Sequence, residues 1–210
     1  MKITMIIATI CIAGSLSAAN DMPADFVEIR TVIPDIILDI RYATTNNFLG
    51  VIHNGFYAAK AWCVKEAADA LSLVQNDLKP QGLKLKIYDA YRPMSSEWQM
   101  IEWALAAGKR SLIGIYIPGS INPLTRYGHV CGNMIDVTLV DKAGKELVMG
   151  TGYDEFSTKA NTMNASGLVL SNRMLLLKTM EKRGFKNYSG EWWHFKYTAK
   201  EHEALNTPIR

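Results

Sequence analysis

The sequence predicts one α+β domain with a central, largely antiparallel sheet flanked by helices. Stretches with strand character come in pairs, helical stretches stand apart from them, and no regular β-α-β units are visible. The 210 residues are 49% hydrophobic and 20% charged, an ordinary globular composition that can bury one sizeable core. No internal repeat, low-complexity segment or linker divides the chain.

The first 19 residues have the features of a secretory signal peptide. Lys2 precedes a short apolar run, and Ser17-Ala18-Ala19 then supplies the small residues of a cleavage site. The run is too short and too poorly flanked for a spanning helix, although an uncleaved membrane anchor is the alternative. We therefore expect residues 20–210 to form the domain. It would be periplasmic or secreted, with no stable membrane insertion after cleavage.

Strands and a helix are predicted in the first part of the domain. β-Branched residues over 26–43 predict one or two strands around Pro34. Apolar residues at helical spacing, beginning with Trp62, predict an amphipathic helix over 60–78. Strict alternation over the first five residues of 83–89 predicts the next strand.

A second helix and a long loop follow. Pro93 opens a helix that runs to about Leu105, in which Trp98, Ile101 and Leu105 are spaced for one face. Residues 108–128 carry Gly and Pro repeatedly and predict a long loop, a class of segment that is often functional.

The chain then returns to the sheet. Residues 132–140 are predicted to form a strand, with a turn at 141–144 and a hairpin partner at 145–149. The remaining predicted elements are an irregular stretch over 150–166, a helix over 171–184, a strand over 191–197 and a short final helix over 199–206.

Two short clusters hold the residue types of a catalytic metal site. His129 and Asp136 lie in HVCGNMID, and Glu191 and His194 lie in GEWWHF. Two imidazoles and one carboxylate make three zinc ligands and leave a fourth position open for water, whose pKa zinc lowers to roughly 7. Each pair alone is usually structural. On a regular strand Glu191 and His194 would face opposite ways, so local twist or the strand's end must bring them together.

The motifs HxxGxxxD, GEWWHF and the upstream YDAYRP together resemble the D-alanyl-D-alanine dipeptidases, a family of VanX-like zinc peptidases. The resemblance runs from about Asp39 to about Tyr197, with the segments in the family's order and approximate spacing. It implies one zinc ion per chain, held by His129, Asp136 and His194.

The resemblance also implies the other site residues. Glu191 would be the general base, and Arg92 would stabilise the tetrahedral oxyanion, a task that suits a permanently charged guanidinium. Asp154 would hold the ammonium of a dipeptide, Tyr42 would line the pocket, and Asp89 would lie beside the arginine. Without the resemblance, Arg92 would be interpreted as a surface residue, Asp154 as a turn or helix-cap residue and Tyr42 as a core residue.

The leading hypothesis is zinc-dependent hydrolysis of D-alanyl-D-alanine, a small peptide substrate. One alternative is a D,D-carboxypeptidase or endopeptidase acting on peptidoglycan stem peptides, and another is a non-catalytic zinc-binding or wall-binding module. Two positions depart from the family. Tyr127 replaces a serine and would reshape the pocket, whereas Met134 replaces an alanine and matters little if it faces the core.

The charges argue against nucleic acid as a partner, because 23 Lys and Arg balance 20 Asp and Glu without a basic stripe. Beyond the predicted signal peptide only Cys63 and Cys131 remain, and the sequence leaves a disulfide and two buried thiols both open. We expect His53 and His202 to be exposed. Trp192 and Trp193 are expected to be packing groups.

Overall fold

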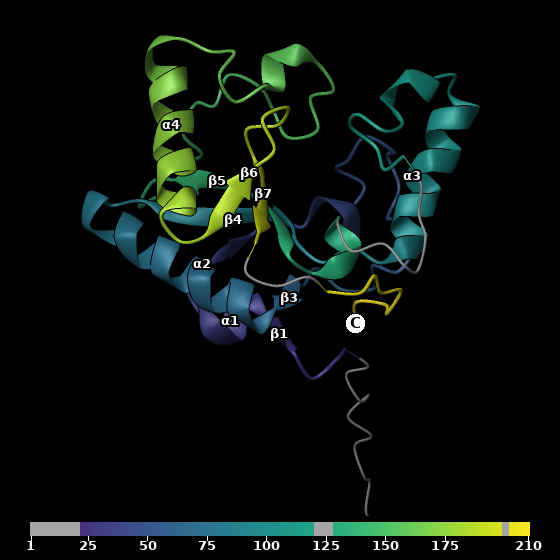
Figure 1. Ribbon diagram of the computed structural model, residues 1–210, viewed down its shortest axis with the longest axis horizontal. Helices are drawn as coiled ribbons and strands as arrows, with labels where there is room; N and C mark the ends of the chain where they lie inside the picture. Colours follow the sequence, from purple (N-terminus) through teal and green to yellow (C-terminus); the bar gives the residue numbers. More distant parts are fainter. Residues whose placement is uncertain (1–21, 120–127, 199–201) are drawn as a thin grey trace, which may run out of the picture.

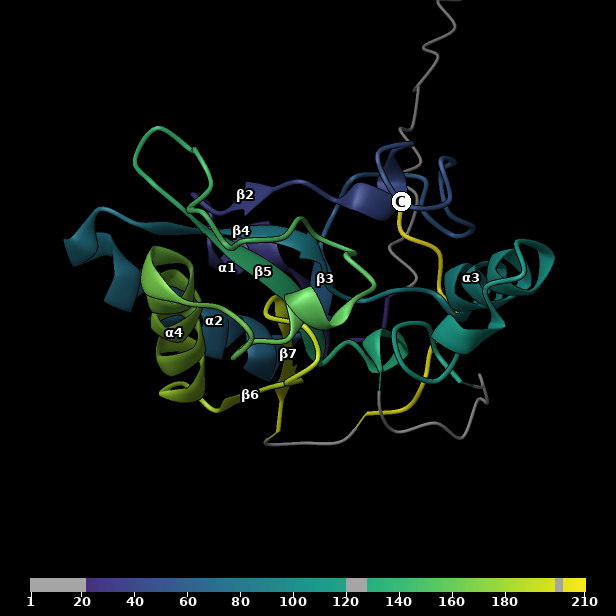
Figure 2. The same cartoon turned by 90° about the horizontal axis from the view of Figure 1, so that it is seen from above.

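The computed structural model describes residues 22–119, 128–198 and 202–210, so the predicted signal peptide and Tyr127 lie outside the described ranges. Figures 1 and 2 show a central sheet with two long helices packed together on one side, whereas a third long helix stands apart from them. The elements are β1 (Phe26–Glu28), α1 (Ile29–Val32), β2 (Ile37–Leu38), β3 (Trp62–Val64), α2 (Lys65–Leu78), β4 (Lys84–Asp89), α3 (Met94–Ala106), β5 (Met134–Val140), α4 (Gly167–Glu181), β6 (Phe185–Asn187) and β7 (His194–Tyr197).

The main sheet has five strands in the order β2-β4-β5-β7-β6. Strand β2 runs parallel to β4, and the other neighbouring pairs are antiparallel. Strands β1 and β3 form a separate antiparallel pair. The predicted α+β class with a largely antiparallel sheet is therefore confirmed. No helix in the described ranges has the length and apolar character needed to span a membrane.

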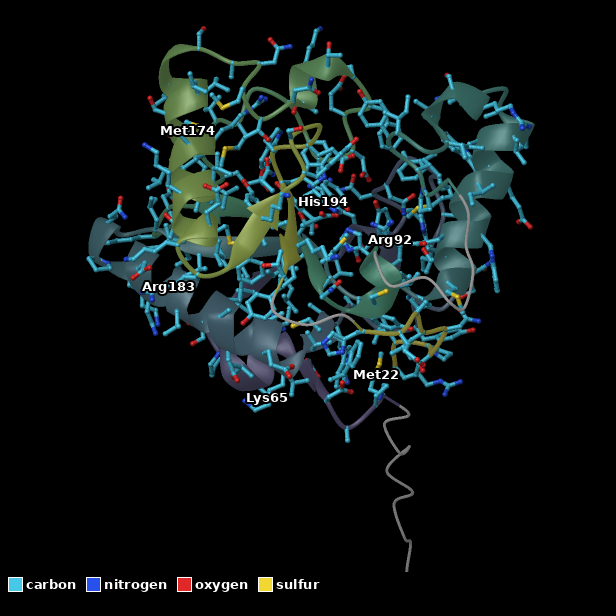
Figure 3. The ribbon with its side chains drawn as sticks, viewed as in Figure 1. Met22, Lys65, Arg92, Met174, Arg183 and His194 are labelled. Carbon is cyan, nitrogen blue, oxygen red and sulfur yellow. The ribbon has the colours of Figure 1, made fainter. Side chains whose placement is uncertain are left out.

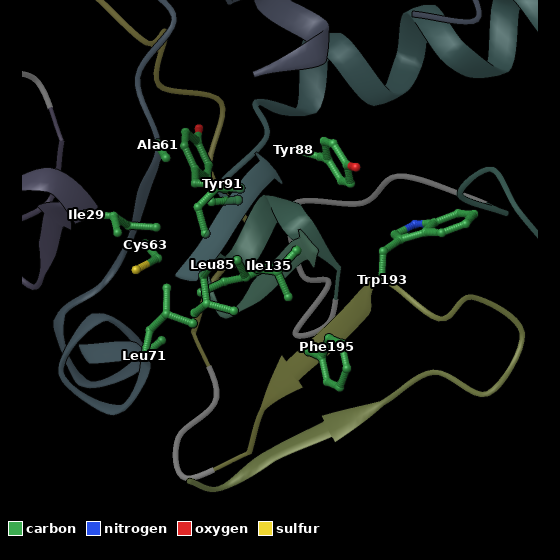
Figure 4. Packing of buried hydrophobic residues seen from close by; sticks show 14 of the residues in the cluster. Ile29, Ala61, Cys63, Leu71, Leu85, Tyr88, Tyr91, Ile135, Trp193 and Phe195 are labelled. Atoms are coloured by element: carbon green, nitrogen blue, oxygen red, sulfur yellow. The ribbon is translucent and has the colours of Figure 1, made fainter. Parts of the chain in front are cut away.

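The core lies between the main sheet and helices α1, α2 and α4 (Figure 4). Ile135 from β5 and Phe195 from β7 meet Leu71 of α2 and Leu85 of β4 in this layer. Strand β5 is buried on both of its faces. Side chains alternate along a strand, so the residues next to Ile135 point to the opposite face of the sheet. That second face carries the polar residues of the site.

Several predicted boundaries are wrong, for physical reasons. Helix α2 begins at Lys65 rather than at residue 60, because Trp62–Val64 is extended and pairs with β1. In the 26–43 stretch, a helical turn at Ile29–Val32 separates the two short strands. Helix α4 begins at Gly167, four residues before the predicted start. The predicted final helix is absent from its described part, residues 202–206.

Residues 145–149 do return beside β5, because the backbone N–H of Leu147 donates to the carbonyl of Leu139. The pairing is limited to one bridge, between Val140 and Glu146, rather than a full strand. In the predicted loop over 108–128, the described part contains a short 3-10 turn at Arg110–Leu112 and one isolated bridge between Ile113 and Ile117.

The predicted face of α3 is mostly exposed. Trp98 and Leu105 are 43% and 48% exposed, Ile101 is partly buried against the core, and the buried side carries Glu97, Met100 and Ala104. This side contains polar residues because it faces the site rather than a purely apolar core. Hydrophobic spacing therefore identified Ile101 correctly and was wrong for Trp98 and Leu105.

Cys63 and Cys131 are both buried thiols and are not joined in a disulfide. The prediction that His53 and His202 are exposed is wrong, because both side chains are buried. His202 has Nδ1 3.3 Å from an Asp25 carboxylate oxygen, and His53 packs beside the site. Trp192 and Trp193 are buried in the core cluster, as expected for packing groups.

Candidate metal centre and active site

Three predicted site residues lie side by side on neighbouring strands. Asp136 on β5 is in register with Asp89 on β4 and with His194 on β7. Directly opposed residues of antiparallel strands project from the same face of the sheet, so these side chains converge. His129 comes from the 3-10 turn just before β5. Figure 3 shows His194 and Arg92 in the middle of the molecule, between the sheet and α3.

The start of β7 explains how Glu191 and His194, three residues apart, reach the same side of the site. The strand begins only at His194, and residues 192 and 193 form a turn before it. The backbone N–H of His194 donates to the carbonyl of Glu191 at 3.3 Å. Glu191 Oε2 consequently lies 3.7 Å from His194 Nδ1, on the same side of the site.

The three predicted metal ligands are close enough to share one ion. His129 Nε2 lies 3.3 Å from His194 Nδ1 and 3.4 Å from Asp136 Oδ2, and His194 Nδ1 lies 3.0 Å from Asp136 Oδ1. Zinc–ligand distances of 2.0–2.2 Å at tetrahedral angles place ligand atoms about 3.4 Å apart. The donor set and its spacing therefore fit a zinc ion.

The surroundings prepare each ligand for a cation. His129 Nδ1 lies 2.7 Å from the carbonyl oxygen of Ala90, which accepts its proton and leaves Nε2 with the lone pair. Asp136 Oδ1 is buried and has no well-aligned hydrogen-bond donor among the described residues, although His194 Nδ1 lies 3.0 Å away. Burial would raise the pKa of Asp136, but the imidazoles of His129 and His194 outweigh it and hold that pKa well below its ordinary value.

Glu191 has the environment of a proton-transfer group. Its burial, with Asp136 adding to the effect and His194 and Arg92 opposing it, raises the pKa of Glu191 to about 7. A general base works best when its pKa is near the working pH. Glu191 can therefore exchange protons near neutral pH at the edge of the three-ligand cluster.

Arg92 is buried and held in place by an ion pair. Its Nε–H donates to Oδ2 of Asp89 at 2.9 Å, and Nη2 lies 2.8 Å from the same oxygen. The guanidinium carbon lies 4.7 Å from the centre of the Tyr42 ring, a cation–π contact. Nη2 lies 3.9 Å from Asp136 Oδ2, and Nη1 lies 3.8 Å from Glu97 Oε1. The arginine is thus aimed at the ligand cluster, and the surface alternative is wrong.

Asp154 and Tyr42 meet on the other wall of the site. Both oxygens of Asp154 lie within reach of the Tyr42 hydroxyl, at 3.1 and 3.2 Å. Asp154 has φ 59°, a left-handed conformation that Asp tolerates better than most residues. Burial raises the pKa of Asp154 well above its ordinary value, against the opposing effect of Arg92.

The hydroxyl of Tyr153 connects the Asp154–Tyr42 pair to the proposed metal ligand Asp136. It lies 2.9 Å from Asp136 Oδ2 and 3.0 Å from the Tyr42 hydroxyl. The Tyr42 hydroxyl donates to Asp154, and the Tyr153 hydroxyl donates to Asp136, so the two hydroxyls link the two carboxyl groups across the site.

One cavity of about 300 Å³ contains these groups. This volume is at the small end of the usual range for ligand pockets. Met134 lines the cavity instead of facing the core, so its difference from the family's alanine does affect the pocket. The predicted site residues that line it are Tyr42, Arg92, His129, Asp136, Asp154, Glu191 and His194.

The sequence prediction missed three residues around this cavity. Glu97 is a buried carboxyl that faces Arg92 from α3, and it follows the arginine by five positions. Tyr153 is the neighbour of Asp154 in the chain, and His53 stacks on Tyr42. The only sequence signal for Glu97 and Tyr153 was that each lies close in the chain to a predicted site residue. Nothing in the sequence around His53 marked it as buried.

Comparisons with known proteins identify a family for this chain. The model of the D-ala-D-ala dipeptidase family, peptidase M15, matches residues 22–209. The chain is 30% identical to D-alanyl-D-alanine dipeptidase of Escherichia coli K12 over 81% of this chain and 83% of that protein. It is 29% identical to the Enterococcus faecalis V583 dipeptidase, over 83% of this chain and 92% of the other. The Streptomyces coelicolor dipeptidase is 28% identical over 89% and 96%.

Among solved structures, the chain is similar to the vancomycin resistance D,D-pentapeptidase VanY in complex with Zn(II). That similarity has a TM-score of 0.38 and 13% identity, over 65% of this chain and 73% of VanY. The family match spans almost all the described residues and includes every residue of the ligand cluster. The chain therefore belongs to the D-Ala-D-Ala dipeptidase family, the M15 peptidases.

Proposed function

We propose that this protein is a zinc-dependent dipeptidase that hydrolyses D-alanyl-D-alanine. The observation that carries the proposal is the closure of His129, Asp136 and His194 within 3.0–3.4 Å of one another, beside Glu191 and Arg92. Relatives over most of the chain have the name of this activity. One zinc ion per chain would be held by these three side chains.

A bound zinc ion would polarise the scissile carbonyl and acidify the attacking water. Glu191 takes a proton from that water and returns it to the leaving amine, and its pKa of about 7 suits both transfers. Arg92 places a fixed positive charge where the carbonyl oxygen becomes negative. Asp89 keeps the guanidinium oriented through a hydrogen bond to Nε and an ion-pair contact with Nη2, so little reorganisation is needed during reaction.

Asp154 recognises the amino terminus of the substrate. It lines the cavity and accepts from the Tyr42 hydroxyl, so its carboxyl is fixed in direction. An arriving ammonium favours the ionised carboxylate and forms a charge-assisted hydrogen bond with it. A carboxylate at this position demands a free amino terminus near the scissile bond, which limits the substrate to a dipeptide.

The test compares two substrates of the purified protein. Release of D-alanine from D-Ala-D-Ala should be much faster than release from a pentapeptide stem that ends in D-Ala-D-Ala. Blocking the amino terminus of the dipeptide should abolish its turnover. Turnover of the stem with none of the dipeptide would reject the dipeptidase and favour a D,D-carboxypeptidase.

We further propose that the protein is exported. The support is the charged, apolar and small-residue pattern of residues 1–19, and the family match begins only at residue 22. Amino-terminal sequencing of protein from the periplasm or medium should begin near Asn20. Recovery of the intact chain in the cytoplasm alone would contradict export.

A further inference from the structure

His53 is a buried histidine beside the site that the proposed chemistry does not use. Its ring is stacked on that of Tyr42, with centroids 4.4 Å apart and an interplanar angle of 27°. The backbone N–H of His53 also donates to the carbonyl of Tyr42, at 2.9 Å. The histidine side chain is only 2% exposed, so its placement is set by the protein rather than by solvent.

Tyr42 is held between two groups. The guanidinium carbon of Arg92 lies 4.7 Å from the centre of the Tyr42 ring, and the His53 ring lies 4.4 Å from it. Two planar groups this close to one ring centre cannot occupy the same face without overlapping. His53 and Arg92 therefore cover opposite faces of Tyr42, and the three side chains form a stack that ends at the site.

The far end of this stack is anchored. His53 Nδ1 lies 2.9 Å from Ser96 Oγ on helix α3, which begins two residues after Arg92. Phe48 contacts the edge of the His53 ring, with centroids 5.9 Å apart. Burial and the charge of Arg92 lower the pKa of His53 to about 3, so the ring is neutral and does not repel the guanidinium.

We propose that His53 is a positioning residue for Arg92. Its ring supports the outer face of Tyr42, and Tyr42 in turn keeps the guanidinium directed at the reacting carbonyl oxygen. This role of His53 rests on the proposed function, in which Arg92 is the oxyanion group. His53 itself adds a residue to that function, because it acts only through Tyr42 and does not line the cavity.

A matched pair of variants separates stacking from core filling. His53→Phe keeps a planar ring against Tyr42, whereas His53→Leu fills similar space without one. Because Arg92 acts on charge that exists only in the transition state, losing the stack should lower kcat and leave KM nearly unchanged. We expect His53→Leu to lose about 10-fold in kcat and His53→Phe to stay within about 3-fold of wild type.

A spectroscopic measurement reports on Arg92 without turnover. Its Nε–H donates to Asp89 and lies beside the Tyr42 ring, so its side-chain NMR signal is protected from exchange and shifted by the ring current. The signal, assigned with Arg92→Lys, should move in His53→Leu and remain in His53→Phe. Phe185→Ala, a buried aromatic substitution on β6, controls for general loss of stability and should leave the signal in place.

Equal kcat and equal Arg92 signals in His53→Leu and His53→Phe would overturn the proposal and leave His53 as packing. If His53→Leu does not fold, Ser96→Ala replaces it, because this change removes only the anchor of the ring. A wild-type kcat and unmoved signal in Ser96→Ala would then overturn it. If wild-type protein fails to cleave D-Ala-D-Ala, the proposed function fails, while the Arg92 signal still tests the role of His53.

Discussion

The hydroxyl of Tyr153 donates a hydrogen bond to Oδ2 of Asp136 at 2.9 Å. This contact gives Asp136, a proposed metal ligand, an outer partner from the same loop that carries Asp154. Groups that hydrogen-bond to ligating side chains fix their orientation and tune their affinity for the metal. Tyr153 therefore connects the proposed metal centre to the wall that would bind the substrate.

Replacing this hydroxyl should weaken metal binding. Tyr153→Phe removes the donor and keeps the ring, so we expect zinc affinity to fall about 10- to 100-fold, as for other outer-shell partners. Competition with a chelator of known affinity measures this effect directly. Tyr197→Phe, on a ring that packs against Phe185 away from the site, is the matched control. An unchanged zinc affinity in Tyr153→Phe would contradict the assigned role.

Replacing the proposed base should separate chemistry from metal binding. Glu191→Gln keeps the size of the side chain but cannot take a proton, so kcat should fall about 10²- to 10⁴-fold. The three metal ligands are intact in this variant, so its zinc content should match that of wild type. Substantial turnover by zinc-loaded Glu191→Gln would show that another group moves the proton.

The selection of a free amino terminus should depend on Asp154. Asn accepts the left-handed backbone at φ 59°, so Asp154→Asn removes the charge without straining the chain. We expect kcat/KM for D-Ala-D-Ala to fall about 10- to 100-fold, since hydrogen bonds to charged groups contribute about 1.5–3 kcal/mol. Steady-state kinetics would show the loss, and wild-type kinetics in this variant would exclude Asp154 from recognition.

Burial of neutral His53 should make stability depend on pH. The pKa of His53 is about 3 in the folded protein against an ordinary value of 6.5, so between these values only the unfolded chain takes up the proton. The stability is fully present above pH 6.5 and is lost as the pH falls. Between pH 7 and pH 5 this costs about 2 kcal/mol, a contribution that His53→Phe lacks.

Urea unfolding of the wild-type protein and of His53→Phe at pH 7 and pH 5 measures this contribution of His53 to the free energy of unfolding. The metal ligands are the same in the two proteins, so release of metal at low pH affects both and cancels in the difference. The loss of unfolding free energy should be smaller in His53→Phe. Equal losses in the two proteins would mean that His53 is protonated in the fold.

The sequence predicted the fold class and the three side chains that converge at the candidate metal centre. Strand β5 is continuous in β-branched and apolar residues, and Asp136 interrupts it as a carboxylate at a buried position. The resemblance of the surrounding motifs to a known family then indicated His129 and His194 as its partners. The register that aligns Asp89, Asp136 and His194 depends on pairing between distant strands, which no local pattern specifies.

What the sequence could not show is the support around those residues. Helix α3 turns Ser96 and Glu97 inward, so its apolar spacing pointed to Trp98 on the exposed side. His53 follows Val51 and Ile52 in a loop, and these two apolar neighbours are themselves exposed. Its burial follows from contacts with Tyr42 and Ser96, which are distant in the chain or on another element.

The most direct test of the account is a zinc titration of the chelator-treated protein, followed by release of D-alanine from D-Ala-D-Ala. Turnover should be absent without metal and should return in proportion to added zinc, reaching its plateau at one ion per chain. Turnover that is insensitive to metal removal, or no turnover of D-Ala-D-Ala with the site saturated, would contradict a zinc dipeptidase built on His129, Asp136 and His194.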